Sequence, residues 1–288
     1  MGDKSIVKRT AQPGSLAARH KQTGALAKHK EQSGFACRER PHYGSSKLQV
    51  AFAFDTTGSM FQYFEKCKKA IHRIAQDVKE NSNAETEFCI ASYKNHGDEE
   101  TYFDGIHPFS ATQFTADIES LQRSLNKVEN GGGGDDGLSA LEDVLHHLTK
   151  EAPWDSNAHK VLVIIGDMPP HGVIDSISRC KYEYDYRAET EVLKAKGVKI
   201  YAVFCYEEYA MISDRLCKVK DFYSWIAKKT DGKYLELADI DEIATLLAAI
   251  CVVENKGSMQ DFRKTLSSRG LLTPSVDKKL KMLEGPNV

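Results

Sequence analysis

The sequence predicts an α/β protein with a doubly wound, mostly parallel six-stranded sheet of Rossmann-like form and helices on both faces. Short apolar runs such as VLVII at 161–165 have the length and composition of strands that are buried on both faces. Between these runs, apolar residues recur every three or four positions, as they do in amphipathic helices. The two patterns alternate along most of the chain, which indicates a parallel sheet built from βαβ units.

Each expected strand is a short segment rich in apolar, aromatic or β-branched residues. The six segments are 48–54, 85–93, 101–106, 161–166, 198–205 and 233–237. The third is expected to lie at an edge of the sheet as part of a hairpin. The first and fourth are expected to be neighbours, because the usual strand order of doubly wound sheets places them side by side.

Each expected helix carries a stripe of apolar residues on one face. The first stripe consists of Met60, Phe64, Cys67, Ile71, Ile74 and Val78. The later helices are expected at 112–128, 138–148, 181–196, 214–230 and 240–250. The final segment, 254–288, is polar and is also expected to be helical.

Charge divides the chain into a basic start and an acidic remainder. The net charge is −2, but residues 1–47 hold ten Lys and Arg against three Asp and Glu, so they carry +7 and the rest carries −9. We therefore predict a basic flexible arm at 1–46, a folded domain at 47–253 and a helical extension at 254–288. Glycines at 14, 24 and 34 begin near-repeats within the arm and would interrupt any long helix.

The charge of the arm suits an anionic partner, either a nucleic acid or an acidic protein. Phe35 and Tyr43 are the only aromatic residues in the arm that could stack on bases. Sequence-specific nucleic-acid binding therefore has little support from the sequence.

Composition excludes several classes of protein. No stretch reaches the roughly 18 consecutive apolar residues of a membrane-spanning helix, so no contact with a membrane is expected. The seven cysteines lack CxxC and CxxH spacings, and those in EFCIA and VFCYE indicate reduced core residues. The first residues lack the apolar core of a secretory signal peptide. The expected location is the cytoplasm, and an organelle reached through the basic N-terminus is the alternative.

Oxygen-bearing side chains follow two of the expected strands. Asp55, Thr57 and Ser59 come after the first strand, and Asp167 follows the fourth. Because ligands of such sheets bind beyond the carboxyl ends of strands where the strand order reverses, these groups are expected in one crevice. A small set of carboxylate and hydroxyl oxygens suits Mg²⁺ better than Zn²⁺. Each residue taken alone could instead cap a helix.

The segment DTTGSM after an apolar strand resembles the metal-ion-dependent adhesion site of von Willebrand factor type A domains, whose motif is DxSxS. The glycine run before Asp135 and the segment GDMPP resemble the second and third ligand segments of that family, in the same order. The resemblance covers roughly 47–252. With YKNHGD and IIGDMPPHG, the sequence looks like the intracellular branch found beside alpha-kinase domains and in bacterial proteins.

The resemblance implies a protein-binding module that depends on a divalent cation, usually Mg²⁺, with Mn²⁺ or Ca²⁺ as alternatives, and that has no catalytic activity. It places Asp55, Thr57, Ser59, Asp135 and Asp167 at the metal. A protein partner would contact the rim of that site, as in an intracellular adaptor. Adhesive members have Thr in the second segment, whereas this chain offers Asp135 or, as the alternative, Asp136. A further carboxylate at the metal would disfavour capture of an acidic side chain from a partner.

Two other interpretations use the same residues. In a phosphatase of the haloacid-dehalogenase type, Asp55 would be the nucleophile and Mg²⁺ the cofactor. That family needs a second acid where Thr57 stands and another Asp where Pro170 and His171 stand. The glycine run also matches the dinucleotide-binding pattern GxGxxG, but it follows an expected helix instead of the first strand, and its aspartates would repel phosphate.

His96 and His171 are expected in loops near the same rim. Two histidines invite ideas of acid–base chemistry or of a second metal. Hydrogen bonds that order the loops are the simpler interpretation.

Overall fold

A computed structural model describes residues 47–81, 84–134, 136–175, 178–205, 213–237 and 239–285. The predicted arm at 1–46 lies outside the described residues. The strands are β1 (Lys47–Asp55), β2 (Glu85–Tyr93), β3 (Phe109–Ala111), β4 (His159–Gly166), β5 (Val198–Cys205) and β6 (Tyr234–Leu237). They form one sheet in the order β3-β2-β1-β4-β5-β6, in which every pairing is parallel except that of β2 with β3.

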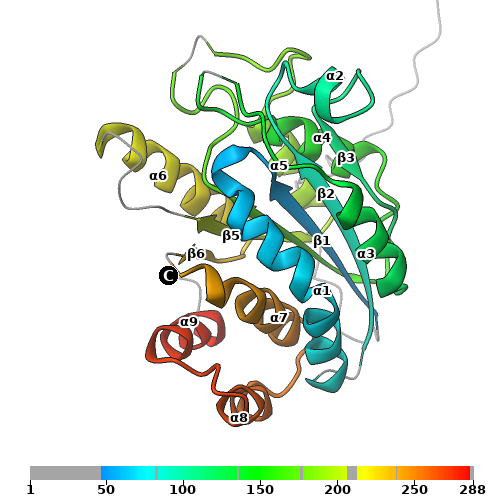
Figure 1. Ribbon diagram of the computed structural model, residues 1–288, viewed down its shortest axis with the longest axis vertical. Helices are drawn as coiled ribbons and strands as arrows, with labels where there is room; N and C mark the ends of the chain where they lie inside the picture. The colour runs from blue at the N-terminus through cyan, green and yellow to red at the C-terminus, as the bar shows by residue number, and fades with distance from the viewer. Residues whose placement is uncertain are drawn as a thin grey trace, which may run out of the picture. The chain divides into compact units, whose positions relative to one another are not determined.

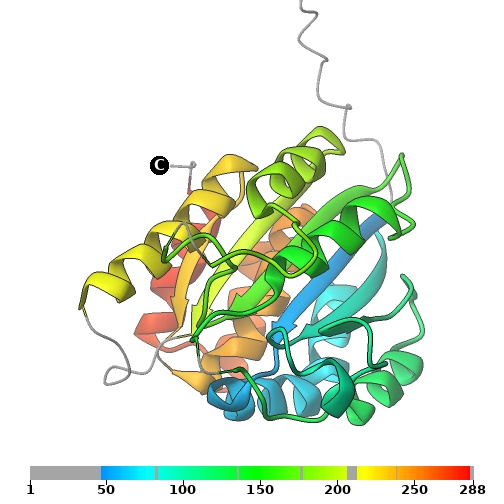
Figure 2. The ribbon, with the colours of Figure 1, turned by 90° about the horizontal axis from the view of Figure 1, so that it is seen from above.

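Helices cover both faces of the sheet, as Figures 1 and 2 show. They are α1 (Phe61–Asn81), α2 (Glu99–Tyr102), α3 (Ile118–Lys127), α4 (Leu141–Lys150), α5 (Tyr186–Ala195), α6 (Ser213–Lys229), α7 (Ile243–Glu254), α8 (Met259–Ser268) and α9 (Pro274–Glu284), with short 3₁₀ turns at Gly58–Met60 and Ile240–Glu242. The predicted fold class is confirmed, and five of the six predicted strands lie where the sequence placed them.

Alternate residues of each strand point to opposite faces, which produces two apolar layers. One layer joins the even-numbered residues of β1, such as Phe52 and Phe54, to α1, α3, α7, α8 and α9. The other joins Ala51 and Ala53 to α4, α5 and α6. Because β1 lies buried in the middle of the sheet, its carboxyl end has a fixed position in the fold.

The third predicted strand, at 101–106, is wrong. Residues Glu99–Tyr102 form the single helical turn α2, and the edge strand β3 begins only at Phe109. Between them, Asp104 accepts hydrogen bonds from the backbone N–H groups of Ile106 and His107, at 2.8 Å each. This turn removes residues 104–107 from any strand, although their aromatic and apolar neighbours match a strand pattern.

Helix α7 is buried on nearly all sides. Ten of its twelve residues, Ile243 to Val252, are buried, and so is Glu254. One side of the helix packs on the sheet and α1, and α8 and α9 cover another side through Phe262, Leu266 and Leu280. Arg269 at the end of α8 also donates a hydrogen bond of 2.5 Å to the buried carboxylate of Asp77 on α1.

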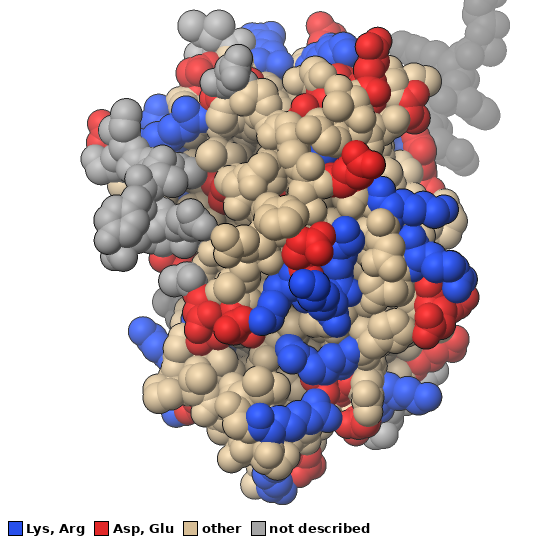
Figure 3. All heavy atoms as spheres, in the orientation of Figure 1, with Lys and Arg blue, Asp and Glu red and all other residues tan. Residues whose placement is uncertain are grey.

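Basic side chains gather over α1 in the orientation of Figure 1 (Figure 3). The sequence of α1 contains four lysines and Arg73. Several of its lysines have acidic neighbours: Lys66 pairs with Asp241, and Lys68 lies 2.9 Å from Glu65. Among the described residues, no helix combines the length and the apolar character required to cross a membrane.

Candidate metal centre

Asp55 ends β1 and lies completely buried. Its Oδ1 accepts hydrogen bonds from the backbone N–H of Thr57 at 2.9 Å and from the Thr57 hydroxyl at 2.6 Å. The Thr57 hydroxyl lies 3.4 Å from that of Ser59, which is exposed. The second carboxylate oxygen, Oδ2, is buried and has no hydrogen-bond partner. A buried carboxylate oxygen without a partner is costly, so its presence indicates a site made for a bound group.

Asp167 follows β4, the strand adjacent to β1. The sheet order reverses between these two strands, so both acids lie at the predicted switch point. Burial, and then the negative charge of Asp167, raises the pKa of Asp55 to about 7. Gly166 permits this approach, because a Cβ there would lie 2.7 Å from the Tyr223 hydroxyl and 3.1 Å from the Asp55 Cβ.

A buried lysine joins the Asp55 loop to the glycine run. The Nζ of Lys94 donates hydrogen bonds to the carbonyl of Thr56 at 2.5 Å and to that of Gly131 at 2.9 Å, and it lies 4.4 Å from the centre of the Tyr102 ring. Burial lowers its pKa to about 8. Sequence reasoning missed this role because a lysine after a strand is usually solvated.

The glycine run lies against the loop that follows β2. Asp98 accepts a hydrogen bond of 2.8 Å from the backbone N–H of Gly133. Gly132 has a φ of +70°, and a Cβ there would lie 2.4 Å from the Asp98 carboxylate. Only glycine fits this close approach. The run therefore serves as a closely packed loop beside Asp55, and no part of it begins a helix as a dinucleotide-binding turn would.

Two acids, Asp135 and Asp136, follow the glycine run, and the structure describes the second of them. Asp135 lies outside the described residues, so its predicted place at the metal stays a prediction. Asp136 accepts hydrogen bonds from the Asn95 side chain at 2.6 Å and from the backbone N–H of Leu138 at 3.0 Å. Its other oxygen lies 3.6 Å from Nε2 of His171.

His96 and His171 do come together, with ring centres 4.9 Å apart. Nδ1 of His171 lies 2.6 Å from Oε1 of the buried Glu142, and the pKa of His171 is raised: burial opposes the charged form, but Glu142 more than offsets it. His96 lies next to Glu142, Asp143 and Cys180. Sequence reasoning missed these three residues.

An exposed aromatic ring lies close in sequence to Ser59. Phe61, the first residue of α1, is 53% exposed, which is unusual for phenylalanine. It lines a shallow pocket with Gly58, Glu65, Asn130 and Gly131. The pocket thus lies between the loop that follows Asp55 and the start of the glycine run.

Comparison with known proteins identifies the family of the folded domain. The sequence profile of the von Willebrand factor type A domain matches residues 49–247. Alpha-protein kinase vwkA of Dictyostelium discoideum is 30% identical over 132 residues, which make up 44% of this chain and 19% of that kinase. The chain therefore matches only a small part of this relative.

Solved structures with the same fold have little sequence in common with the chain. The open conformation of the pilus adhesin SpaC from Lactobacillus rhamnosus GG has a TM-score of 0.55 and 13% identity, over 73% of this chain and 30% of that one. A von Willebrand factor type A protein from Catenulispora acidiphila has a TM-score of 0.51 and 12% identity, over 73% and 43% of the two chains. At these identities, the likeness shows the fold alone.

Proposed function

Because the chain belongs to the von Willebrand factor type A family, we propose that it is a divalent-cation-dependent protein-interaction module that acts as an intracellular adaptor. The observation that carries the proposal is the buried Asp55 Oδ2, which has no hydrogen-bond partner at the end of the central strand. Asp55, Thr57, Ser59 and Asp167 would hold Mg²⁺, and Asp135 would complete the set.

The donor set fits a hard cation. The residues assigned to the site offer carboxylate and hydroxyl oxygens, which Mg²⁺, Mn²⁺ and Ca²⁺ prefer. Bound there, the cation would supply a Lewis-acidic position for an oxygen atom of a partner. Lys94 and the glycine run would keep the Asp55 loop in place, and Thr57 would keep the Asp55 carboxylate oriented.

The rim supports a protein as the partner. Phe61 offers an apolar anchor that a small hydrophilic ligand would not use, and aromatic residues are enriched among the energetically dominant contacts of interfaces. The adjoining pocket adds exposed backbone from Gly58 and Gly131. The proposal assigns no reaction to the chain.

Metal binding is the first test. We expect wild-type protein to bind Mg²⁺ in titration calorimetry and to gain thermal stability with it, by mass action. Asp55→Ala removes both oxygens at the centre of the site, so the affinity should fall at least about 100-fold, as losses near metals usually do. Asp104→Ala, at an exposed turn, is the control and should bind as wild type. Equal binding by wild type and Asp55→Ala would contradict the site assignment.

Partner binding is the second test. Full-length protein is immobilised and exposed to native lysate with Mg²⁺ or with EDTA, and the retained proteins are compared by mass spectrometry. Partners are expected to be lost with EDTA and with Asp55→Ala. Phe61→Ala should lose them while it still binds Mg²⁺, because its side chain contributes no metal ligand.

The phosphatase alternative predicts a different result. Wild type would hydrolyse an aryl phosphate in the presence of Mg²⁺, and Asp55→Ala would not. A set of retained proteins that is the same with and without EDTA would likewise count against the adaptor role.

A further inference from the structure

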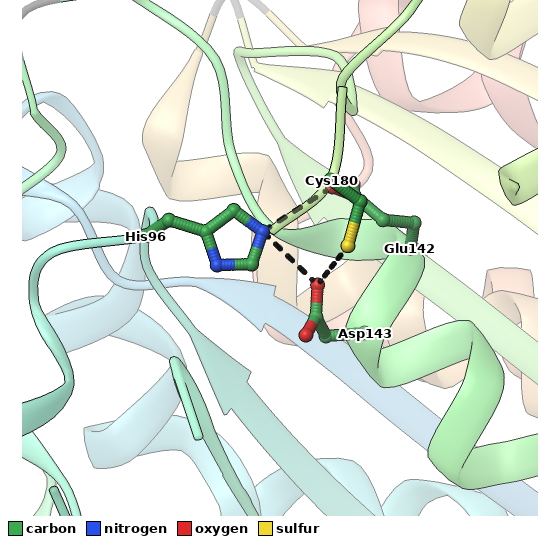
Figure 4. Close-up of side chains that lie close together, drawn as sticks. All are labelled: His96, Glu142, Asp143 and Cys180. Atoms are coloured by element: carbon green, nitrogen blue, oxygen red, sulfur yellow. Dashed lines mark hydrogen bonds and ion pairs between the residues drawn. The ribbon is translucent and has the colours of Figure 1, made fainter. Parts of the chain in front are cut away.

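We propose that His96, Glu142, Asp143 and Cys180 form a second metal site, made of residues different from those around Asp55, that takes Zn²⁺ or a similar transition-metal ion. One atom from each side chain lies within 4.8 Å of the others, and Figure 4 shows the four side chains converging from three segments of the chain. His96 follows β2, the two acids begin α4, and Cys180 lies in the loop before α5.

The distances between these atoms suit tetrahedral coordination. Zinc bonds of 2.0–2.3 Å place neighbouring ligands about 3.3–3.8 Å apart. Nε2 of His96 lies 3.4 Å from Oδ2 of Asp143 and 3.6 Å from Oε1 of Glu142. Sγ of Cys180 lies 3.4 Å from the same Asp143 oxygen. The two ligand atoms that lie farthest apart, within 4.8 Å of each other, would need to move about 1 Å closer together.

Unpartnered buried atoms are a second and independent observation. Oε2 of Glu142 and Oδ1 of Asp143 have no hydrogen-bond partner, although both side chains are only 1% exposed. A cluster designed only for ion pairing would leave no such atoms, because each costs about 1–3 kcal/mol. These are the second oxygens of the two carboxylates, and a cation bound through the first oxygens would offset the cost of burying both charges.

The surroundings match the outer shell of a metal site. Metal-binding histidines commonly direct their other ring nitrogen to a carboxylate. Nδ1 of His96 lies 3.6 Å from Oε1 of Glu99, which is too far for a hydrogen bond but close enough for one to form after a small shift. His171 bonds to Glu142 at 2.6 Å and orients that carboxylate. The backbone N–H of Lys181 makes a long contact of 3.4 Å with Nε2 of His96, which a metal would replace.

The donor types separate this site from the one at Asp55. A thiolate and an imidazole favour Zn²⁺ over Mg²⁺. Binding would break the S–H bond of Cys180 and form a zinc–sulfur bond, and the proton would leave to solvent. A cleft of about 680 Å³ is lined by Asp143, His146 and Tyr184, so it borders one member of the cluster.

The consequence would be a metal clamp on the rim. The segments that carry Cys180 and His96 are already in contact. Nζ of Lys181, the residue after Cys180, lies 3.1 Å from Oε1 of Glu99, three residues after His96. His171 connects the cluster to Asp136 beside the glycine run. Zinc would therefore hold together three segments that lie next to the loop carrying Asp136.

Cobalt(II) is the probe that tests the site, because only a sulfur ligand gives thiolate-to-cobalt charge-transfer absorption in the near ultraviolet. We expect full-length wild type to show this band, to lose it when Zn²⁺ is added, and to melt at a higher temperature with Zn²⁺. Cys180→Ser should abolish the band and weaken Zn²⁺ binding at least about 100-fold. Cys217→Ser, at an exposed cysteine, and Cys37→Ser should keep it.

Two further variants make the result decisive. Asp55→Ala should keep the band, because it leaves the second site intact, and His96→Asn should weaken cobalt binding at least about tenfold. An unchanged far-ultraviolet spectrum checks that each variant folds. The absence of the band from wild type would overturn the proposal, and so would its persistence in Cys180→Ser.

Discussion

Replacing Asp55 by asparagine is expected to stabilise the metal-free protein and to abolish its response to Mg²⁺. Burial and the charge of Asp167 raise the pKa of Asp55 from 3.8 to about 7, so this group lowers the stability of the fold progressively from about pH 4 to pH 7, and fully above pH 7. The full penalty at pH 8 corresponds to about 4 kcal/mol. Asparagine keeps an Oδ1 that accepts the hydrogen bonds from Thr57. Its side-chain NH₂ group would be buried without an acceptor, which costs about 1–3 kcal/mol. The expected net gain in unfolding free energy is about 2 kcal/mol.

Urea unfolding at pH 8, with EDTA and with Mg²⁺, measures this effect. Because the folded-state pKa is the higher one, the stability of metal-free wild type should rise as the pH falls from 7 towards 4. Asp55→Asn should not show this rise. Asp117→Asn is the matched control, since Asp117 accepts a backbone N–H at an exposed helix start, where Asp and Asn are equivalent. A destabilised Asp55→Asn that still responds to Mg²⁺ would refute the argument.

Replacing Glu254 by glutamine is expected to cost about 3 kcal/mol of stability at pH 7. This buried carboxylate at the end of α7 accepts from Lys199 at 2.7 Å and from the Tyr201 hydroxyl. His159 also lies 2.9 Å from it. Burial alone would raise the pKa of Glu254, but the hydrogen bond from His159 and the charge of Lys199 lower it from 4.5 to about 2.

The pH dependence distinguishes this cause from a packing defect. Because the folded-state pKa is depressed, the contribution of Glu254 is present above pH 4.5 and is lost as the pH falls towards 2. The stability difference between wild type and Glu254→Gln should therefore shrink over that range. Glu191→Gln removes an exposed pair with Lys229 and should change stability by less than about 0.5 kcal/mol. A difference that does not change down to pH 2 would indicate packing instead.

Much of the fold could be predicted because buried strands and amphipathic helices leave regular patterns. Strand β4 is apolar from Val161 to Ile165, and the stripe from Met60 to Val78 matches the buried face of α1. The segment 101–106 was mispredicted because Tyr102 and Phe103 look like strand residues. In the structure, Tyr102 instead stacks beneath the Lys94 ammonium, a contact that depends on tertiary structure.

The residues of the two candidate metal sites differ in how readily they can be recognised from the sequence. Asp55, Thr57 and Ser59 form a local motif, so their proximity follows from the chain turning after a strand. In the sequence, Glu142 and Asp143 look like ordinary acids in the first turn of a helix, where a negative charge interacts favourably with the helix dipole. Only the packing of α4 against the loops after β2 and β4 brings them to His96 and Cys180.

The burial of α7 has a consequence for synthesis on the ribosome. A helix that is apolar on almost all sides is not stable when exposed to water. Within the described residues, the outer side of α7 is covered by α8 and α9, which are the last elements along the chain. Since chains emerge from N- to C-terminus, the layer containing α1 and α7 can close only after residues up to about Glu284 have left the exit tunnel. Until then, nascent chains would expose an aggregation-prone surface. We therefore expect chaperone binding to stalled chains to end once Leu283 has emerged.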